Sequence, residues 1–188
     1  MDRATTGQVA VVQARAPAPR LEFRTVFQEH FAYVWNSLRH FGVRANDLED
    51  LTHEVFLRVH ERFDECDTSR PLRPWLFAFA YRVAAAHRRL ARHRVEVMRA
   101  DIDAAAETAP ADHVLMQRED RELALGVLQA IALDRRAVFI LHDIDGVPIP
   151  EVAEALQMPV NTAYSRLRLA RMECHAAVRR LRRARGER

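Results

Sequence analysis

The chain has 188 residues and a formal net charge of +3, and 49% of its residues are hydrophobic, enough for one large or two small cores. Its five glycines are too few for a turn-rich all-β fold. No apolar run approaches the roughly 18 residues of a membrane span, and we predict no signal peptide. Cys66 and Cys174 are far apart and form no metal-ligand pattern, which favours a reducing, cytoplasmic setting.

The N-terminal half predicts a tail followed by two amphipathic helices. Residues 1–20 are rich in alanine, proline, threonine and arginine without helical periodicity, so we expect a disordered tail. Gly42 ends a first helix, whose apolar residues recur at steps of four and three: Phe27, Phe31, Val34, Leu38 and Phe41. Asn46 and Glu49 have capping-box spacing for a second helix. That helix has an apolar stripe made of Leu48, Leu51, Val55 and Val59, widened by Phe56 and Phe63.

A third helix couples aromatic residues to arginines. It follows a polar loop at residues 64–72, has Pro74 in its first turn and is expected to run from Trp75 to about Arg94. Its aromatic residues are Trp75, Phe77, Phe79 and Tyr81, and its arginines are Arg82, Arg88, Arg89, Arg92 and Arg94. Aromatic rings stack on unpaired bases and arginines follow phosphates, which suits melted DNA. Trp75 and Phe79 are one turn apart, however, and are better explained as core residues.

The C-terminal half predicts a second helical domain after a linker at residues 96–113. Helices are expected from about Val114 to Ala132 and from Arg135 to His142, the latter capped by Asp134. Asp145-Gly146 predicts a turn, and Pro148 and Pro150 begin a short helix. A break at residues 157–160 then precedes a last helix that Asn161 can cap. The final pair has the spacing of a helix-turn-helix, although an ordinary helical hairpin with solvated arginines fits the same pattern.

The charge is strongly segregated along the chain, and all 29 basic residues are arginine. Residues 82–94 and 166–188 are strongly basic, whereas residues 46–67 are acidic. This alternation indicates two phosphate-contacting regions and a third that meets a basic partner. Asp47, Asp50 and Glu54 share one face of the acidic helix, with no complementary histidine or serine cluster, so protein docking or plain solvation is favoured over catalysis.

In order and spacing, these segments resemble a bacterial RNA polymerase sigma factor of the small extracytoplasmic-function type. DLEDLTHEVFLRVHERF is similar to the core-binding helix of that family, and RPWLFAFAYRVAAAHRRLARHR to its promoter-opening, −10-reading helix. DRRAVFILHDIDGVPIPEVAEALQMPVNTAYSRLRLARME is similar to its −35-reading domain. The resemblance covers roughly residues 25–94 and 121–181. It implies an all-α fold of two small helical domains, region 2-like at 21–95 and region 4-like at 114–188, joined by a flexible linker.

The resemblance also implies three groups of site residues. A polymerase-binding surface would comprise Asp47, Asp50 and Glu54. Contacts to the −10 element would come from Asp67, Thr68, Ser69, Arg73, Tyr81, Arg82, Arg88 and Arg89, with the loop at residues 64–72 holding a flipped base. Contacts to the −35 element would come from Pro159, Asn161, Thr162, Tyr164, Ser165, Arg166, Arg168 and Arg171. Arg82 stands where many members have asparagine, and Tyr164 replaces a common basic residue, so promoter sequences cannot be copied from relatives.

The expected function is therefore that of a non-enzymatic initiation factor that needs no cofactor or metal. It would bind core RNA polymerase and promoter DNA, with an anti-sigma factor as a further partner, without membrane insertion or a small-molecule substrate. The alternative is a stand-alone helix-turn-helix repressor or activator that uses residues 25–94 for dimerisation or ligand sensing. Partner dependence separates the two, because a repressor binds a palindrome tightly by itself.

Overall fold

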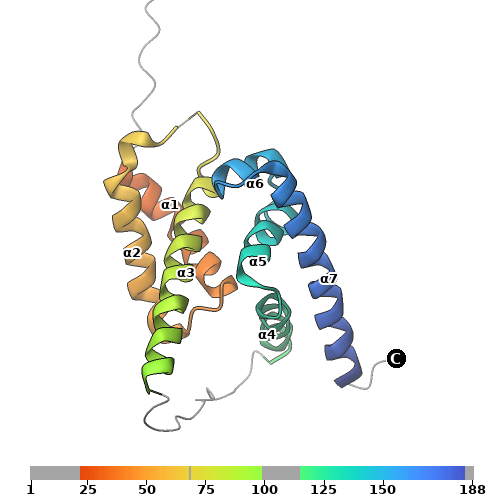
Figure 1. The fold of residues 1–188 in the computed structure, drawn as a ribbon. Helices are drawn as coiled ribbons and strands as arrows, with labels where there is room; N and C mark the ends of the chain where they lie inside the picture. Colours follow the sequence, from red (N-terminus) through yellow and green to blue (C-terminus); the bar gives the residue numbers. More distant parts are fainter. Residues whose placement is uncertain (1–21, 68, 99–114, 185–188) are drawn as a thin grey trace, which may run out of the picture.

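The computed structural model describes residues 22–67, 69–98 and 115–184, and every long element within these ranges is an α-helix (Figure 1). The predicted all-α class and the two helical domains are confirmed. The predicted tail at 1–20 and residues 99–113 of the predicted linker lie outside the described residues. The third helix continues to Met98, four residues beyond its predicted end.

The first domain consists of three helices that all pack against one another: α1 (Phe23–His40), α2 (Leu48–Glu61) and α3 (Leu72–Met98). The predicted stripes form its core, with Val34, Leu38, Leu48 and Val59 at most 4% exposed. Gly42 ends α1 with a φ of 83°, a left-handed conformation that glycine adopts without the steric cost of a side chain. Periodicity therefore predicted both the helices and the faces that they bury.

The second domain consists of four helices: α4 (Leu115–Gln129), α5 (Leu133–Phe139), α6 (Ile149–Ala155) and α7 (Val160–Ala184). A π-helical turn, Ile140–Ile144, extends α5, and α7 packs against α4, α5 and α6. Buried Ala153 and Ala163 are small enough to let α6 and α7 approach closely where they cross. Gln157 has a φ of 54° in the tight turn between them. The predicted break and helix-turn-helix spacing are therefore present.

Three predicted helix caps are wrong. Asn46 lies inside a short 3₁₀ turn, Ala45–Asp47, that precedes α2, so the capping box with Glu49 does not form. Asp134 lies inside the first turn of α5, whose N-cap is Ala132. Asn161 likewise lies inside the first turn of α7, which begins at Val160. α5 and α7 thus begin earlier than predicted, whereas α2 begins later, after the 3₁₀ turn; helix ends are the least certain part of a prediction from sequence.

The two domains are packed side by side (Figure 1), and two helices of the first domain contact the second: α1 packs against α4, and α3 packs against α6. One continuous hydrophobic core includes buried residues of both domains. Arg136 of α5 is only 1% exposed, and its guanidinium donates to the carbonyl oxygens of Gln129 and Ile131 at 2.9 Å and of His40 at 3.1 Å. Arg136 therefore donates to carbonyls at or just after the C-terminal ends of two helices, α4 of the second domain and α1 of the first.

Candidate functional site

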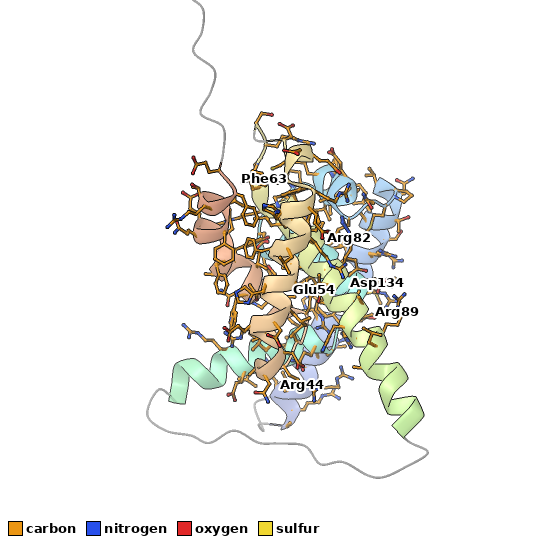
Figure 2. The ribbon with its side chains drawn as sticks, turned by 90° about the vertical axis from the view of Figure 1, so that its left-hand side faces the viewer. Arg44, Glu54, Phe63, Arg82, Arg89 and Asp134 are labelled. Carbon is orange, nitrogen blue, oxygen red and sulfur yellow. The ribbon has the colours of Figure 1, made fainter. Side chains whose placement is uncertain are left out.

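The acidic face of α2 is the first candidate surface. Asp50 is exposed, and Glu54 is half-exposed and accepts a hydrogen bond from Arg58 at 2.5 Å. Asp47 differs from both, because it is half-buried and lies 3.4 Å from Arg44 and 3.6 Å from His87 of α3. The structure therefore brings Asp50 and Glu54 onto an exposed face of α2, on which Figure 2 shows Glu54, whereas Asp47 lies near His87 at the α2–α3 junction.

Leu57 also belongs to this exposed face of α2. It follows Glu54 by three residues and Asp50 by seven, so all three share one side of the helix. Its side chain is 66% exposed although α2 carries a well-filled apolar stripe on its other side. Sequence analysis missed Leu57, although its position outside that stripe could have identified it.

The loop after α2 and the start of α3 form a second candidate surface. The Asp67 carboxylate accepts hydrogen bonds from the backbone N–H of Ser69 at 3.0 Å and from its hydroxyl at 2.6 Å. These bonds hold the pKa of Asp67 below its ordinary value and fix a turn in the loop. Thr68 lies outside the described residues. Arg73 is exposed and lies over the ring of Tyr33, 5.4 Å from its centroid.

A cavity of about 270 Å³ lies between this loop, α3 and α6. Cys66, Trp75 and Arg82 of the first domain line one side of it, and Glu151 and Glu154 of the second domain line the other. Phe79 is buried, as predicted, and the Arg82 guanidinium lies 5.2 Å from its ring centroid. Burial, followed by nearby Arg62, lowers the pKa of Arg82. The first-domain side of the cavity thus combines aromatic rings with charges of both signs, since Glu65 and Asp67 line it beside the arginines, whereas the charged residues of the second-domain side are both acidic.

A larger inter-domain groove of about 1050 Å³ runs along α3. Tyr81, Arg88 and Arg89 line it from α3, opposite Leu133 and Asp134 at the start of α5. Tyr81 is half-buried, and burial raises the pKa of its hydroxyl. Arg82 and Arg89 lie along the same helix as seen in Figure 2. The predicted −10 residues of α3 therefore lie at the domain boundary rather than on a separate face.

The N-terminal half of α7 forms the fourth candidate surface. Tyr164 is 55% exposed, and Ser165 and Arg168 are also exposed. Pro159 and Asn161 are exposed at its beginning, and Thr162 is half-buried. These side chains are placed as a helix that enters a DNA groove requires.

Two predicted −35 residues are instead engaged with carboxylates of the same domain. Arg166 lies 3.3 Å from Asp134 of α5. Arg171 forms a bidentate pair with Asp143 at 2.9 and 2.6 Å, and this pair lowers the pKa of Asp143. Bidentate pairing uses the same guanidinium edge that would bind a phosphate or guanine. Of Arg166, Arg168 and Arg171, Arg168 is therefore the one whose exposed guanidinium is best placed to contact DNA in this structure.

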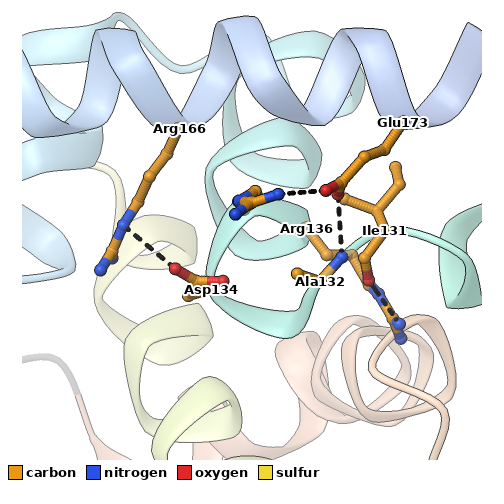
Figure 3. A network of polar contacts seen from close by, with 7 residues as sticks. Ile131, Ala132, Asp134, Arg136, Arg166 and Glu173 are labelled. Carbon is orange, nitrogen blue, oxygen red and sulfur yellow. Dashed lines mark hydrogen bonds and ion pairs between the residues drawn. The ribbon is translucent and has the colours of Figure 1, made fainter.

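A polar network fixes α7 against the rest of the second domain (Figure 3). Glu173 of α7 accepts from Arg135 of α5 and, at 3.1 Å, from the backbone N–H of Ala132. Glu173 thus satisfies the backbone N–H of the residue that precedes α5 and ties α7 to the start of that helix. Because its partners are 38 and 41 residues away, local sequence rules could not identify it.

The described part of the chain holds neither a metal-ligand cluster nor a membrane-spanning helix. Among the described residues, no group of three or more His, Cys, Asp or Glu side chains is placed to hold a metal ion. No helix within the described ranges combines the length and hydropathy that a bilayer crossing requires. The surfaces instead combine arginines, aromatic rings and one acidic helix face.

Comparison with known proteins identifies the two domains. Residues 26–94 match the family described as Sigma-70 region 2, and residues 121–174 match Sigma-70, region 4. The ECF RNA polymerase sigma factor SigL of Mycobacterium tuberculosis is 31% identical over 175 residues, covering 93% of this chain and 94% of SigL.

Two solved structures share the fold. The sigma factor RpoE of Bartonella quintana, in complex with the anti-sigma factor NepR, aligns with a TM-score of 0.63 and 16% identity over 84% of this chain and 96% of that one. CnrH, in complex with the cytosolic domain of CnrY, aligns with a TM-score of 0.51 and 22% identity over 83% of this chain and 86% of that one.

Proposed function

The chain belongs to the extracytoplasmic-function group of RNA polymerase sigma factors, and from that premise we propose how its surfaces share the work of promoter recognition. The protein binds core RNA polymerase, recognises −35 and −10 elements and promotes DNA opening. The family consists of non-enzymatic initiation factors, so polymerisation chemistry belongs to the partner. Membership does not favour the stand-alone repressor or activator.

The acidic face of α2 is the proposed polymerase-docking surface. Asp50 and Glu54 supply charge, and Leu57 adds an apolar anchor that is 66% exposed. A central apolar side chain ringed by charges is the usual composition of a specific protein interface. Asp47 has a different role in this proposal, because its contacts to Arg44 and His87 join α2 to α3.

The loop at residues 64–72 and α3 form the proposed −10 surface. The 270 Å³ cavity beside Trp75 and Arg82 is large enough for a single unstacked base. Tyr81, Arg88 and Arg89 continue from it along α3 and would follow the strand by stacking and phosphate contacts. Ser69 and Arg73 are exposed in the loop and the first turn of α3, where they would add contacts to the strand. The energy released when bases bind here offsets the cost of unstacking them.

The exposed start of α7 is the proposed −35 surface, and it is the observation that carries the proposal. Tyr164, Ser165 and Arg168 point outward from a helix that follows a tight turn after α6. Arginine can bind guanine through two hydrogen bonds, and serine can bind either a base or a phosphate. Arg166 and Arg171 would exchange their carboxylate partners for DNA.

Four further assignments complete the proposal. The protein has no enzymatic activity of its own, and it acts in the cytoplasm, where core polymerase is found. An anti-sigma factor is a third partner, since both similar solved structures are complexes with such proteins or with a cytosolic domain. Residues 96–113 connect the domains while both are bound to promoter DNA.

Transcription from a promoter library with purified core polymerase tests the whole proposal. We expect start sites that require this chain and share two elements at a fixed separation. Tight binding of the chain alone to a symmetric site, without new starts, would instead establish a repressor or activator.

A charge reversal tests the docking surface separately. Asp50→Arg should weaken polymerase binding by about tenfold or more, because an exposed interface charge is reversed while the core stays intact. Co-purification with tagged core polymerase measures the effect, and circular dichroism checks the fold. Asp64→Arg, an exposed substitution outside α2, is the control. Unchanged co-purification of the Asp50 variant would contradict the docking assignment.

A further inference from the structure

The second domain contacts the proposed −10 loop through one charged pair. Arg70, at the end of that loop, binds Glu154 of α6 through both guanidinium nitrogens, at 2.6 and 2.8 Å. The two residues are 84 positions apart, so the pair exists only because the domains are packed together. Glu151, one turn earlier on α6, also lines the cavity and adds negative charge near Arg70.

The geometry of this pair is that of a phosphate contact. Two parallel N–H···O bonds from one guanidinium are how arginine binds either a carboxylate or a phosphate. While Glu154 accepts both bonds, that edge of Arg70 cannot bind the backbone of a DNA strand. The same helix closes the second side of the 270 Å³ cavity, where the base would enter. A DNA strand therefore cannot enter the cavity and bind Arg70 while Glu154 is paired with Arg70.

The contact is placed to be reversible. The Arg70 and Glu154 side chains are 52% and 60% exposed, and ion pairs of such exposure contribute little net stability. Other links join the domains away from the cavity: the shared hydrophobic core, the hydrogen bond from the Tyr33 hydroxyl to Asp145 at 2.7 Å, and the bond from Arg136 to the His40 carbonyl. Arg70 and Glu154 thus control access to the cavity without carrying the whole domain interface.

We propose that Glu154 is an internal substitute for a DNA phosphate, which holds α6 over the −10 loop in the free protein and must release Arg70 before a strand can bind. Arg70 is then a DNA-contacting residue that becomes available only when the domains separate. The inference rests on the proposed function, because it assigns the strand to this loop. Separation of the domains would then be required before a DNA strand can bind to the loop.

Cys66 provides a direct test of the closed contact. It is half-buried and lines the cavity beneath α6, so its alkylation rate reports on access to that space. In a Cys174→Ser background, Glu154→Gln should raise the rate by about threefold, the scale expected for one exposed pair. The rate is measured on its high-pH plateau, because burial and Asp67 raise the pKa of the Cys66 thiol. Glu122→Gln, an exposed change on α4, is the charge-matched control.

Strand binding gives the second test. A fluorescent single strand of about 15 nucleotides with random sequence should bind Glu154→Gln about threefold more tightly than wild type or Glu122→Gln at low ionic strength. The double variant Arg70→Glu, Glu154→Arg rebuilds the pair in reverse. It should protect Cys66 as wild type does, yet bind the strand more weakly than wild type, because Arg70 itself is gone.

The outcomes separate this inference from the proposed function. Equal Cys66 rates in Glu154→Gln and wild type would overturn the closed contact. Faster alkylation with unchanged strand affinity would overturn the competition between Glu154 and DNA. A promoter library without chain-dependent starts would refute the proposed function, whatever the Cys66 rates are.

Discussion

The two domains share one hydrophobic core, but the side chains that fill it differ. The first domain is rich in aromatic contacts: Phe27 and Phe56 have ring centroids 4.7 Å apart, and Phe41 and Phe77 lie at 5.0 Å. The second buries mainly aliphatic side chains, has small alanines where α6 and α7 cross, and adds long-range ion pairs such as Arg135–Glu173 and Arg171–Asp143. Partly exposed ion pairs weaken with added salt and with protonation of the carboxylate, whereas apolar burial involves no titrating group. Solution conditions should therefore act on the second domain through these pairs while its apolar core persists.

Phe41→Ala should produce the largest effect, and it tests how much the aromatic packing stabilises the first domain. Phe41 is fully buried between Phe77 and Tyr81, so truncation leaves a cavity and should cost about 3–5 kcal/mol of unfolding free energy. Urea unfolding followed by circular dichroism measures it. Leu57→Ala, which removes an exposed side chain from the same domain, should change stability little. Equal effects of the two substitutions would contradict the aromatic-core interpretation.

Arg136→Met tests the side chain of α5 that also bonds to the first domain, through the His40 carbonyl. Burial, followed by nearby Arg88, lowers the pKa of Arg136 to about 10, so the side chain remains charged at neutral pH. Methionine fills similar space but leaves the carbonyls of Gln129, Ile131 and His40 without this donor. We expect a loss of about 2 kcal/mol, measured by urea unfolding. The exposed Arg121→Met on α4 is the control, and a loss equal in both variants would refute the carbonyl-capping role.

Arg168→Ala should change promoter recognition by the second domain without changing the stability of that domain. Arg168 is exposed on α7, so its removal should leave both domains folded and polymerase affinity unchanged. Loss of one base contact should reduce discrimination at the −35 element by about 1–3 kcal/mol. The promoter library measures this shift. Unchanged promoter preference would mean that another face of α7 reads the DNA.

The sequence predicted local features well and distant polar contacts poorly. The stripe Leu48, Leu51, Val55 and Val59 is buried as predicted, because a repeat of 3.6 residues sets which side chains share a helix face. Gly42 was likewise predictable, since a helix end favours the φ above zero that glycine tolerates. These features depend on neighbours within a few positions of the chain.

Contacts between distant residues could not be predicted in the same way. Glu173 of α7 accepts from the backbone N–H of Ala132 just before α5, and Arg70 meets Glu154 across 84 positions. The sequence contains many arginines and carboxylates that could pair, and only the packed domains select among them. The predicted cap at Asp134 failed because α5 begins at Leu133, so that Asp134 lies inside the helix. The site-residue assignments to polymerase and DNA remain predictions for the experiments above.

The smallest expected effect concerns the pH response of the Arg171–Asp143 pair. The hydrogen bonds from Arg171 depress the pKa of Asp143 below its ordinary value of 3.8. A carboxyl with a depressed pKa stabilises the fold above that ordinary value, and this contribution is lost as pH falls through the folded-state pKa. Because Arg171 is half-exposed, solvent screening limits the contribution to less than about 1 kcal/mol.

Asp143→Asn should therefore lower the free energy of unfolding slightly at neutral pH, and the difference from wild type should shrink once the pH is well below 3.8. Urea unfolding at both pH values measures it, and subtraction of the two proteins removes the titration of every other carboxyl. The exposed Asp64→Asn in the first domain should give a small difference at both pH values. A constant difference for Asp143→Asn would mean that the contribution of the pair is not electrostatic, and the contrast between the two domains would then rest on packing alone.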